Sequence, residues 1–346
     1  MEAPVPRAEL EKIVNDPDAP YFEKGRALEQ LLAKNGWRTT HSSEEAYCRA
    51  AFSFSSERAR QLVAAYGVYM LLRASPTTAA KLPANEAQIR PLTVIPHERQ
   101  SEAWLYILRN APGGRITQAY VQGVCQQIAI APGSPIRFLT AEDVPDTAWP
   151  SDNDHDIPLL SLRLQAQYCD LPFLCFGGKS RAAIAATWHF YTDDARFDNL
   201  IEDPTPVVNS RCINAVEPNF SVYGQMPRIT GLERIYQKRR IARFWQSQGV
   251  RIFVDLNVHP DFYQDNLLGV PWGWKAYATR GYVDRINDTI REFELACQRA
   301  ETNDLLFVVY GGGQEVKKTA QDYGWTWFPE LSDTARNRPV TYEQTV

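Results

Sequence analysis

The sequence predicts an N-terminal all-helical region followed by a mainly parallel α/β domain, a fold of class α + α/β. Two observations on its 346 residues lead to this expectation. Residues 8–128 place apolar side chains at the three- and four-residue spacing of amphipathic helices, with no strand pattern between them. Beyond residue 158, short apolar runs of strand length alternate with helical stretches, as in a parallel sheet with crossover helices. This pattern fits an open sheet and also one closed into a barrel.

The helices of the first region are bounded by capping residues or by breakers. Ser42 or Ser43 can cap the helix that starts at residue 44, while Gly36, Pro96 and the sequence APGG separate other helices. The expected helices span residues 22–35, 44–52, 56–73, 85–95, 98–110 and 117–128.

The second region shows strand-like and helical segments in turn. The expected strands are 173–176, 184–191, 212–216, 251–256, 276–279 and 305–310, and the expected helices are 232–248, 283–300 and 315–323. Residues 129–157 are rich in proline and aspartate, which is typical of a connection, and the tail after 331 is polar. We therefore divide the chain into a helical region 1–128, a connection 129–157, an α/β domain 158–330 and a tail 331–346.

The composition is that of an ordinary globular protein and excludes several classes. Hydrophobic residues make up 44% and charged residues 23% of the chain, which argues against disorder. No apolar run is long enough for a membrane span, and the first residues lack the apolar stretch of a signal peptide. The six cysteines form no CxxC pair. We expect a protein of the bacterial cytosol or nucleoid with no membrane partner.

The net charge of −4 conceals a positive segment. Residues 38–128 carry ten basic and six acidic side chains, and residues 129–160 carry one basic and six acidic. Excess positive charge in one module is what binding to a phosphate backbone requires.

Residues 44–52 and 56–73 have the proportions of a helix-turn-helix. In that motif the first turns of the second helix meet base edges, where arginine can pair with guanine and glutamine with adenine. The alternative is an ordinary helical hairpin with arginines on its surface. The candidate base-contacting residues are Ser56, Arg58, Arg60 and Gln61.

Two stretches, SEEAYCRAAFSFSSERARQLVAAYGVYMLL and LPANEAQIRPLTVIPHERQSEAWLYILRNAPGGRITQAYVQGV, resemble the helical DNA-binding region of ParB-like plasmid and phage proteins. The resemblance covers about residues 42–126, and FSFSS departs from the glycine-bearing turn usual in that group. It implies binding to double-stranded DNA. Arg90, in the matching block EAQIRPL, is a candidate phosphate contact; alternatively this polar segment before Pro91 caps and locks neighbouring helices.

Polar residues follow several of the predicted strands of the α/β domain. Because functional groups gather at the carboxyl ends of parallel strands, these residues could do acid–base or phosphate chemistry on one rim. The alternative is that they form turns and cap helices. The candidate catalytic residues are Glu217, Asn219, Asp255, Asn257, His259 and Arg280.

The same rim offers candidate sites for a metal and for a phosphate. Asp255 and His259 alternate along an extended segment and are candidate metal ligands, with Mg²⁺ the expected ion if the domain is an enzyme. The sequence GGGQEV opens a helix after a strand, which suits a phosphate, although it matches neither common nucleotide-binding motif.

A basic helix in the second region is a candidate second nucleic-acid surface. The sequence RITGLERIYQKRRIARFW interleaves cations with aromatic residues, and its candidate phosphate contacts are Lys238, Arg239, Arg240 and Arg243. A sheet-covering helix with an apolar inner face and a solvated basic outer face would fit equally, and the two interpretations are compatible.

The blocks FDNLIEDP, VEPNFSVYGQMPRI, ERIYQKRRIARFWQSQGVRIFVDLNV, LLGVPWGWKAYATRG and LLFVVYGGG resemble an uncharacterised family of phage and bacterial domains of unknown function. The resemblance covers residues 184–330 and implies no activity.

Together these patterns predict a sequence-specific DNA-binding protein of a plasmid, phage or other mobile element, serving replication, partition or transcription control. Its α/β domain would act on DNA or assemble on it, with a homo-oligomer as the candidate assembly. One alternative is a DNA-directed enzyme, a nuclease, hydrolase or base- or sugar-modifying enzyme, that uses the rim at 217–219 and 255–259. Another is a regulator switched by a ligand in the α/β domain.

Overall fold

The computed structural model of the chain describes residues 5–33, 36–130, 133, 136–146, 148–177 and 186–330. The chain divides into two compact units, residues 1–136 and 137–346. The first is helical and the second is built on a seven-stranded parallel sheet, so the predicted fold class is confirmed. The predicted tail at 331–346 lies outside the described residues. None of the described helices combines the length and the apolar character that crossing a membrane demands.

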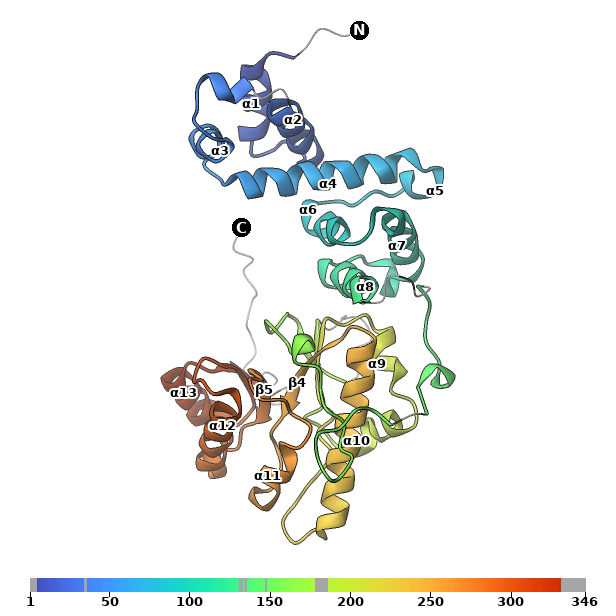
Figure 1. Cartoon of the computed structure of the whole chain (residues 1–346), viewed down its shortest axis with the longest axis vertical. Coiled ribbons are helices and arrows are strands. Elements are labelled where there is room, and N and C mark those ends of the chain that lie inside the picture. The colour runs from blue at the N-terminus through green and yellow to red at the C-terminus, as the bar shows by residue number, and fades with distance from the viewer. Residues whose placement is uncertain are drawn as a thin grey trace. The chain divides into compact units, whose positions relative to one another are not determined.

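The helical unit is organised around its longest helix, α4, which runs between α1–α3 on one side and α6–α8 on the other (Figure 1). Its α-helices are α1 (Arg7–Asn15), α2 (Tyr21–Ala33), α3 (Glu44–Phe52), α4 (Ser56–Ala74), α5 (Pro76–Ala79), α6 (Glu86–Ile89), α7 (His97–Asn110) and α8 (Gln118–Ile130), with 3-10 helices at Gly36–Thr39, Arg90–Val94 and Pro112–Gly114.

Local capping sets the bounds of α3 and α4. The hydroxyl of Ser43 accepts a hydrogen bond from the backbone N–H of Ala46, and that of Ser55 from the N–H of Arg58. Between the helices Ser53 adopts a left-handed conformation (φ 61°), the role that glycine usually takes at the end of a helix. The turn is thus made without glycine, and the two helices occupy the predicted positions.

The helix expected at residues 85–95 is wrong as a single element. It splits into α6 and the 3-10 helix Arg90–Val94, because Pro91 has no N–H to continue the α-helical ladder.

The α/β unit contains seven strands in sequential order, each parallel to its neighbours. The strands are β1 (Phe173–Cys175), β2 (Thr187–His189), β3 (Asn214–Val216), β4 (Arg251–Asp255), β5 (Ala276–Arg280), β6 (Leu306–Tyr310) and β7 (Thr326–Phe328). The α-helices are α9 (Thr205–Asn209), α10 (Arg228–Ser247), α11 (Tyr263–Asn266), α12 (Ile286–Ala300) and α13 (Gly313–Tyr323). The 3-10 helices are Ala141–Asp143, Leu162–Leu164, Asp194–Arg196, Asp198–Ile201, Pro260–Phe262 and Val283–Arg285.

The two faces of the sheet pack in different ways because side chains alternate along each strand. Ile252 and Val254 of β4 lie in the large core that includes Trp245 of α10. Phe253, between them, points to the opposite face and joins a second cluster with Val308 of β6. Helices thus cover one face, and the other is concave.

Aromatic side chains bring the two edges of the sheet together on the concave face. The ring centroids of Phe173 in β1 and Phe328 in β7 are 4.5 Å apart and stacked, although these strands are six positions apart in the sheet. The rings of His189 in β2 and Tyr310 in β6 are 4.3 Å apart. The sheet is therefore curled into a half-barrel, and these rings fill its interior.

Residues 160–171 cross the amino-terminal ends of the central strands. The backbone N–H of Ala166 donates to the carbonyl of Ile252 (2.9 Å), and Asn214 Nδ2 donates to the carbonyl of Tyr168 (3.1 Å). Part of the expected connection also packs on this unit, since Leu139 N–H donates to Asn209 Oδ1 (2.7 Å). These segments therefore lie away from the carboxyl ends of the strands, where the polar pocket described below opens.

Candidate functional site: a polar pocket at the carboxyl ends of the strands

A cavity of about 720 Å³ opens where β2, β3, β4 and β5 end. This size lies within the range of ligand sites, about 300–1,000 Å³. Four of the candidate catalytic residues line it, namely Asn219, Asn257, His259 and Arg280. Glu217 and Asp255 do not; they are fully buried beside it. Asp193 and Asp194, which follow the expected strand 184–191, line it as well. Sequence reasoning missed the other lining residues, which are Tyr191, Thr192, Ser221, Val222, Tyr223, Val258, Tyr282 and Arg285.

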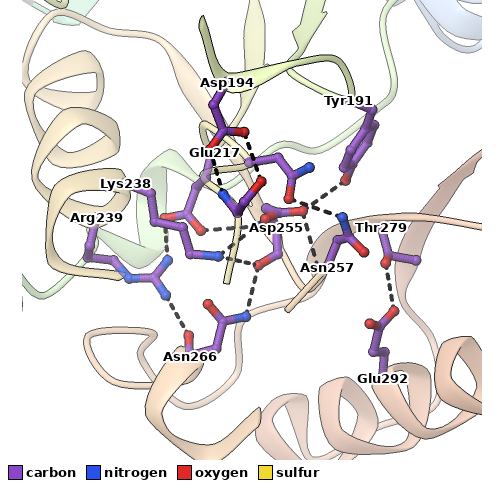
Figure 2. Close-up of polar contacts among 12 residues, drawn as sticks. Tyr191, Asp194, Glu217, Lys238, Arg239, Asp255, Asn257, Asn266, Thr279 and Glu292 are labelled. Carbon is purple, nitrogen blue, oxygen red and sulfur yellow. Dashed lines mark hydrogen bonds and ion pairs between the residues drawn. The ribbon is translucent and has the colours of Figure 1, made fainter. Parts of the chain in front are cut away.

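Asp255 is surrounded by hydrogen-bond donors (Figure 2). Its Oδ1 accepts from the hydroxyl of Tyr191 and from the backbone N–H of Asn257, each at 3.2 Å. Its Oδ2 lies 3.2 Å from Nζ of Lys238. Burial raises the pKa of Asp255 to about 6, against the lowering effect of Lys238. The carboxyl is held in place and has no open side, which suits a positioning role better than that of a general base.

Asn219 and Asn257 join this buried group to the pocket. The amide of Asn219 takes the orientation in which Nδ2 donates to Asp255 Oδ2 and to the backbone carbonyl of Asn257, each at 3.2 Å, while Oδ1 accepts from Asn257 Nδ2. In this orientation both the oxygen and the nitrogen of the Asn219 amide have hydrogen-bond partners. The loops after β3 and β4 are thereby fixed to each other.

Glu217 and Arg239 form a second buried ion pair next to the first. The guanidinium donates to Glu217 Oε1 through one nitrogen and to the carbonyl of Asn266 through another (2.7 Å). The other oxygen of Glu217 accepts from the backbone N–H of Asp255 (3.2 Å). Helix α10 is thus tied to the ends of β3 and β4.

These contacts correct the interpretation of α10 as a basic nucleic-acid surface. Lys238 and Arg239 are 1% and 0% exposed, so the prediction that they contact phosphates is wrong. Arg240 is half-buried and donates to the carbonyl of Ile201 (2.5 Å). Arg243 is half-buried with its guanidinium 4.9 Å from the ring centre of Trp149. All four cations contact groups of their own unit. Other segments of the unit pack against the flanks of α10 as well as against its apolar face.

A third buried carboxyl, Glu292 of α12, forms no ion pair with any of the described residues. It accepts a hydrogen bond from the hydroxyl of Thr279 (2.6 Å), and burial raises its pKa well above the ordinary value (Figure 2). Among the described residues, Glu217, Asp255 and Glu292 thus share this region with two buried cations, Lys238 and Arg239. Charge balance favours a proton on one of these acids, and Glu292 is the one without an ion-pair partner.

The candidate metal site is not supported by these donors. Among the described residues, no group of three or more His, Cys, Asp or Glu side chains is placed to hold a metal ion. The carboxylate of Asp255 already accepts hydrogen bonds from Lys238 and from neutral donors. His259 Nδ1 accepts a hydrogen bond from the backbone N–H of Asp261 (3.3 Å). The residues present therefore do not fit Mg²⁺ at Asp255 and His259.

The glycine turn after β6 is explained by packing. A Cβ on Gly311 would lie 2.6 Å from Glu330 Oε1, and one on Gly312 would lie 2.9 Å from the backbone of Gly281. Both residues have positive φ. Close approach of the chain to itself thus accounts for both glycines without a ligand.

In the helical unit, most of the candidate DNA-contacting residues have partners inside the unit. Ser56 donates through its N–H and its hydroxyl to Glu45 (2.7 Å each), and Arg60 pairs with Glu44 (3.0 Å). Arg58 makes a two-point ion pair with Glu86 at 2.5 Å.

The other two candidate DNA-contacting residues are Arg90 and Gln61. Arg90 binds the same carboxylate of Glu86 (3.0 Å), which agrees with the interpretation that this segment locks neighbouring helices. Gln61 is exposed on α4.

Comparison with known proteins gives relatives without a described activity. The chain is 30% identical over 88 residues to the Gene 1 protein of Mycobacterium phage D29, which is 25% of this chain and 33% of the phage protein. It is 28% identical over 88 residues to the Gene 1 protein of Mycobacterium phage L5, covering 25% and 38%. The chain thus spans little more than a third of the length of these relatives.

No solved structure matches the chain. Residues 150–323, half of the chain and most of the α/β unit, match the family described as Domain of unknown function (DUF4417). The chain belongs to this family.

Proposed function

We propose that the α/β unit binds a phosphate-bearing ligand in the polar pocket. The observation that carries this proposal is the pair of arginines at the β5 end. Their guanidinium carbons lie 5.4 Å (Arg280) and 4.0 Å (Arg285) from the ring centre of Tyr282. Arg280 Nε is buried with no hydrogen-bond partner in the part of the chain that the structure describes, while its NH2 group binds Glu330 (3.0 Å). Both arginines line the pocket, Arg285 with an exposed side chain, and guanidinium groups bind phosphate oxygens by charge-assisted hydrogen bonds.

The enclosure of Asp255 leads us to propose binding rather than turnover for this pocket. A general base must reach the proton that it removes. Asp255 is 0% exposed, and its carboxylate oxygens accept hydrogen bonds from Tyr191, Lys238 and the backbone of Asn257.

Calorimetric titration of the full chain with pyrophosphate tests the proposal. Arg285→Gln removes an exposed guanidinium from the pocket edge, and we expect it to weaken binding about tenfold. Lys318→Gln, which removes an exposed cation from α13, is the matched control and should bind as the wild type does. Equal affinity of both variants, or no binding by the wild type, would overturn the proposal.

We propose, second, that the helical unit binds double-stranded DNA. The specific observation in favour is that α3 and α4 form two capped helices joined by residues 53–55, as in a helix-turn-helix. The positive balance of residues 38–128 supports it. Gln61 is the candidate base contact because its amide is exposed, while Arg58 and Arg90 position α4 and α6 through Glu86.

Selection of binding sites from random DNA, followed by gel shifts, tests this second proposal. Gln61→Ala should lose about 1–3 kcal/mol on the selected site and relax the preference at one base pair. Gln118→Ala, an exposed glutamine on α8, is the control. Loss of equal size on every sequence would remove Gln61 as a base contact, and the absence of any salt-dependent binding would end the proposal. Repeating the gel shifts with pyrophosphate present shows whether the ligand alters DNA affinity.

A further inference from the structure

We propose that the ligand of the pocket is a nucleotide unit, with its base on Tyr223 and its phosphate at Arg280 and Arg285. This inference rests on the proposed phosphate-binding function and names the class of ligand. Three features of the pocket carry it: an exposed aromatic ring with no ring or cation on it, the order of strands β3, β4 and β5, and the acidic side chains that line the pocket besides the arginines.

The two tyrosines in loops at the pocket edge have different surroundings. Tyr282 has both arginine guanidinium groups on its ring and serves to orient them. Tyr223, in the loop between β3 and α10, is 63% exposed. Among the described residues no aromatic ring or cation lies on it. An exposed ring at the edge of a polar pocket is a platform on which a base can stack.

Strand order sets the distance between the two ends of the ligand. Tyr223 follows β3, the arginines follow β5 or end it, and β4 lies between them. Neighbouring strands are about 4.8 Å apart, so the ends of β3 and β5, from which the two loops start, are separated by about 10 Å. A mononucleotide can reach from one to the other, whereas inorganic phosphate cannot.

The pocket also contains acidic side chains. Asp193 and Asp194 line it after β2. Asp194 is held by the N–H and hydroxyl of Ser221 (2.9 and 3.1 Å), while Asp193 is exposed. These carboxylates repel a phosphate and can accept hydrogen bonds from the N–H groups of a base. They therefore favour the phosphate at the two arginines and leave the base to Tyr223.

Asn257 lies between the two ends, on the β4 loop. Its backbone N–H is bonded to Asp255 and its Nδ2 to Asn219, which fixes the side chain. Its Oδ1 makes no hydrogen bond with the described residues and can accept one from a sugar hydroxyl or a base N–H. The buried ion pairs Lys238–Asp255 and Arg239–Glu217 would then serve to hold the amide of Asn257 in place.

Calorimetry on the full chain with four 5′-mononucleotides, ribose 5-phosphate and pyrophosphate separates this inference from the proposal on which it rests. We expect at least one mononucleotide to bind about tenfold or more tightly than ribose 5-phosphate, because stacking adds to the phosphate contact. Tyr223→Ala should abolish that difference and Tyr223→Phe should restore it. Tyr168→Ala, at a 72% exposed tyrosine outside the pocket, should behave as the wild type.

A 5′-phosphorylated single-stranded trinucleotide distinguishes the two sources of the nucleotide unit. Tighter binding of the trinucleotide assigns the pocket to a strand end, and tighter binding of the mononucleotide assigns it to a free nucleotide. If ribose 5-phosphate binds as well as every nucleotide, the inference is wrong while phosphate binding stands. If none of these compounds binds, including pyrophosphate, both are wrong.

Discussion

Nζ of Lys238 lies 3.2 Å from Oδ2 of Asp255 and 3.0 Å from the carbonyl oxygen of the same residue. Both side chains are at most 1% exposed. A lysine on helix α10 therefore binds both the side chain and the backbone carbonyl of the last residue of strand β4, inside the core. This pair explains why a basic helix binds within its own unit, and it leads to the first prediction.

Lys238→Ala should lower the free energy of unfolding by about 3–5 kcal/mol, because it leaves the carboxyl of Asp255 buried without its cation. Guanidinium chloride unfolding near pH 7 measures the loss. Lys318→Ala, at an exposed site on α13, should change the stability by less than about 0.5 kcal/mol. A change below about 1 kcal/mol for Lys238→Ala would mean that water reaches Asp255 easily.

Glu292→Gln should stabilise the protein increasingly as the pH rises. The folded pKa of Glu292 lies above the unfolded value, so the wild type retains full stability below the unfolded pKa of 4.5 and loses it as the pH rises toward the folded pKa. The glutamine keeps an acceptor for Thr279 and carries no proton to lose. The difference should grow by up to about 1.4 kcal/mol per pH unit above the unfolded pKa.

Unfolding curves at about pH 5 and about pH 8 check this expectation. Glu294→Gln, at an exposed site on the same helix, is the control. The same difference at both pH values would show that Glu292 titrates normally.

Two glycines near the α2–α4 crossing should respond to alanine in opposite directions. A Cβ on Gly25 would lie 2.5 Å from the carbonyl oxygen of Leu62, so Gly25→Ala should cost about 1–3 kcal/mol. A Cβ on Gly67 would meet nothing within 4 Å, so Gly67→Ala should gain about 0.5–1 kcal/mol. Melting temperatures of the two variants decide the matter. Destabilisation by both would mean that α4 has a second close neighbour at Gly67.

The stacked rings of Phe173 and Phe328 should be energetically coupled. A double-mutant cycle with leucine at both positions should give a coupling of about 0.5–1.5 kcal/mol, because each ring loses its aromatic partner. The control cycle pairs Phe173 with Phe293, which lies in the helix-side core, and should give a value near zero. A zero value in the first cycle would indicate that the edges of the sheet separate in solution.

Much of the pocket was predictable from residues that follow strands. Asn219, Asn257, His259 and Arg280 come from three separate strand ends, and all four line one cavity. The rule that parallel strands end at one edge was sufficient for this. Tyr223, Tyr282 and Arg285 stand in loops where no local pattern marks them. Their position depends on how each loop folds back over the rim.

Local sequence by itself determined where the longer helices and strands β1 to β6 lie, but not the short strand β7 or the division of residues 85–95. The bounds of α3 were predictable to the residue because caps and breakers act over three or four positions along the chain. Only the tertiary structure decided which charges face solvent. Lys238 and Asp255 are 17 residues apart, and Arg58 and Glu86 are 28 apart. Helical periodicity describes one helix, whereas burial depends on everything packed around it. Lys238 and Arg239 look solvated in the sequence of α10 but are buried in the α/β unit.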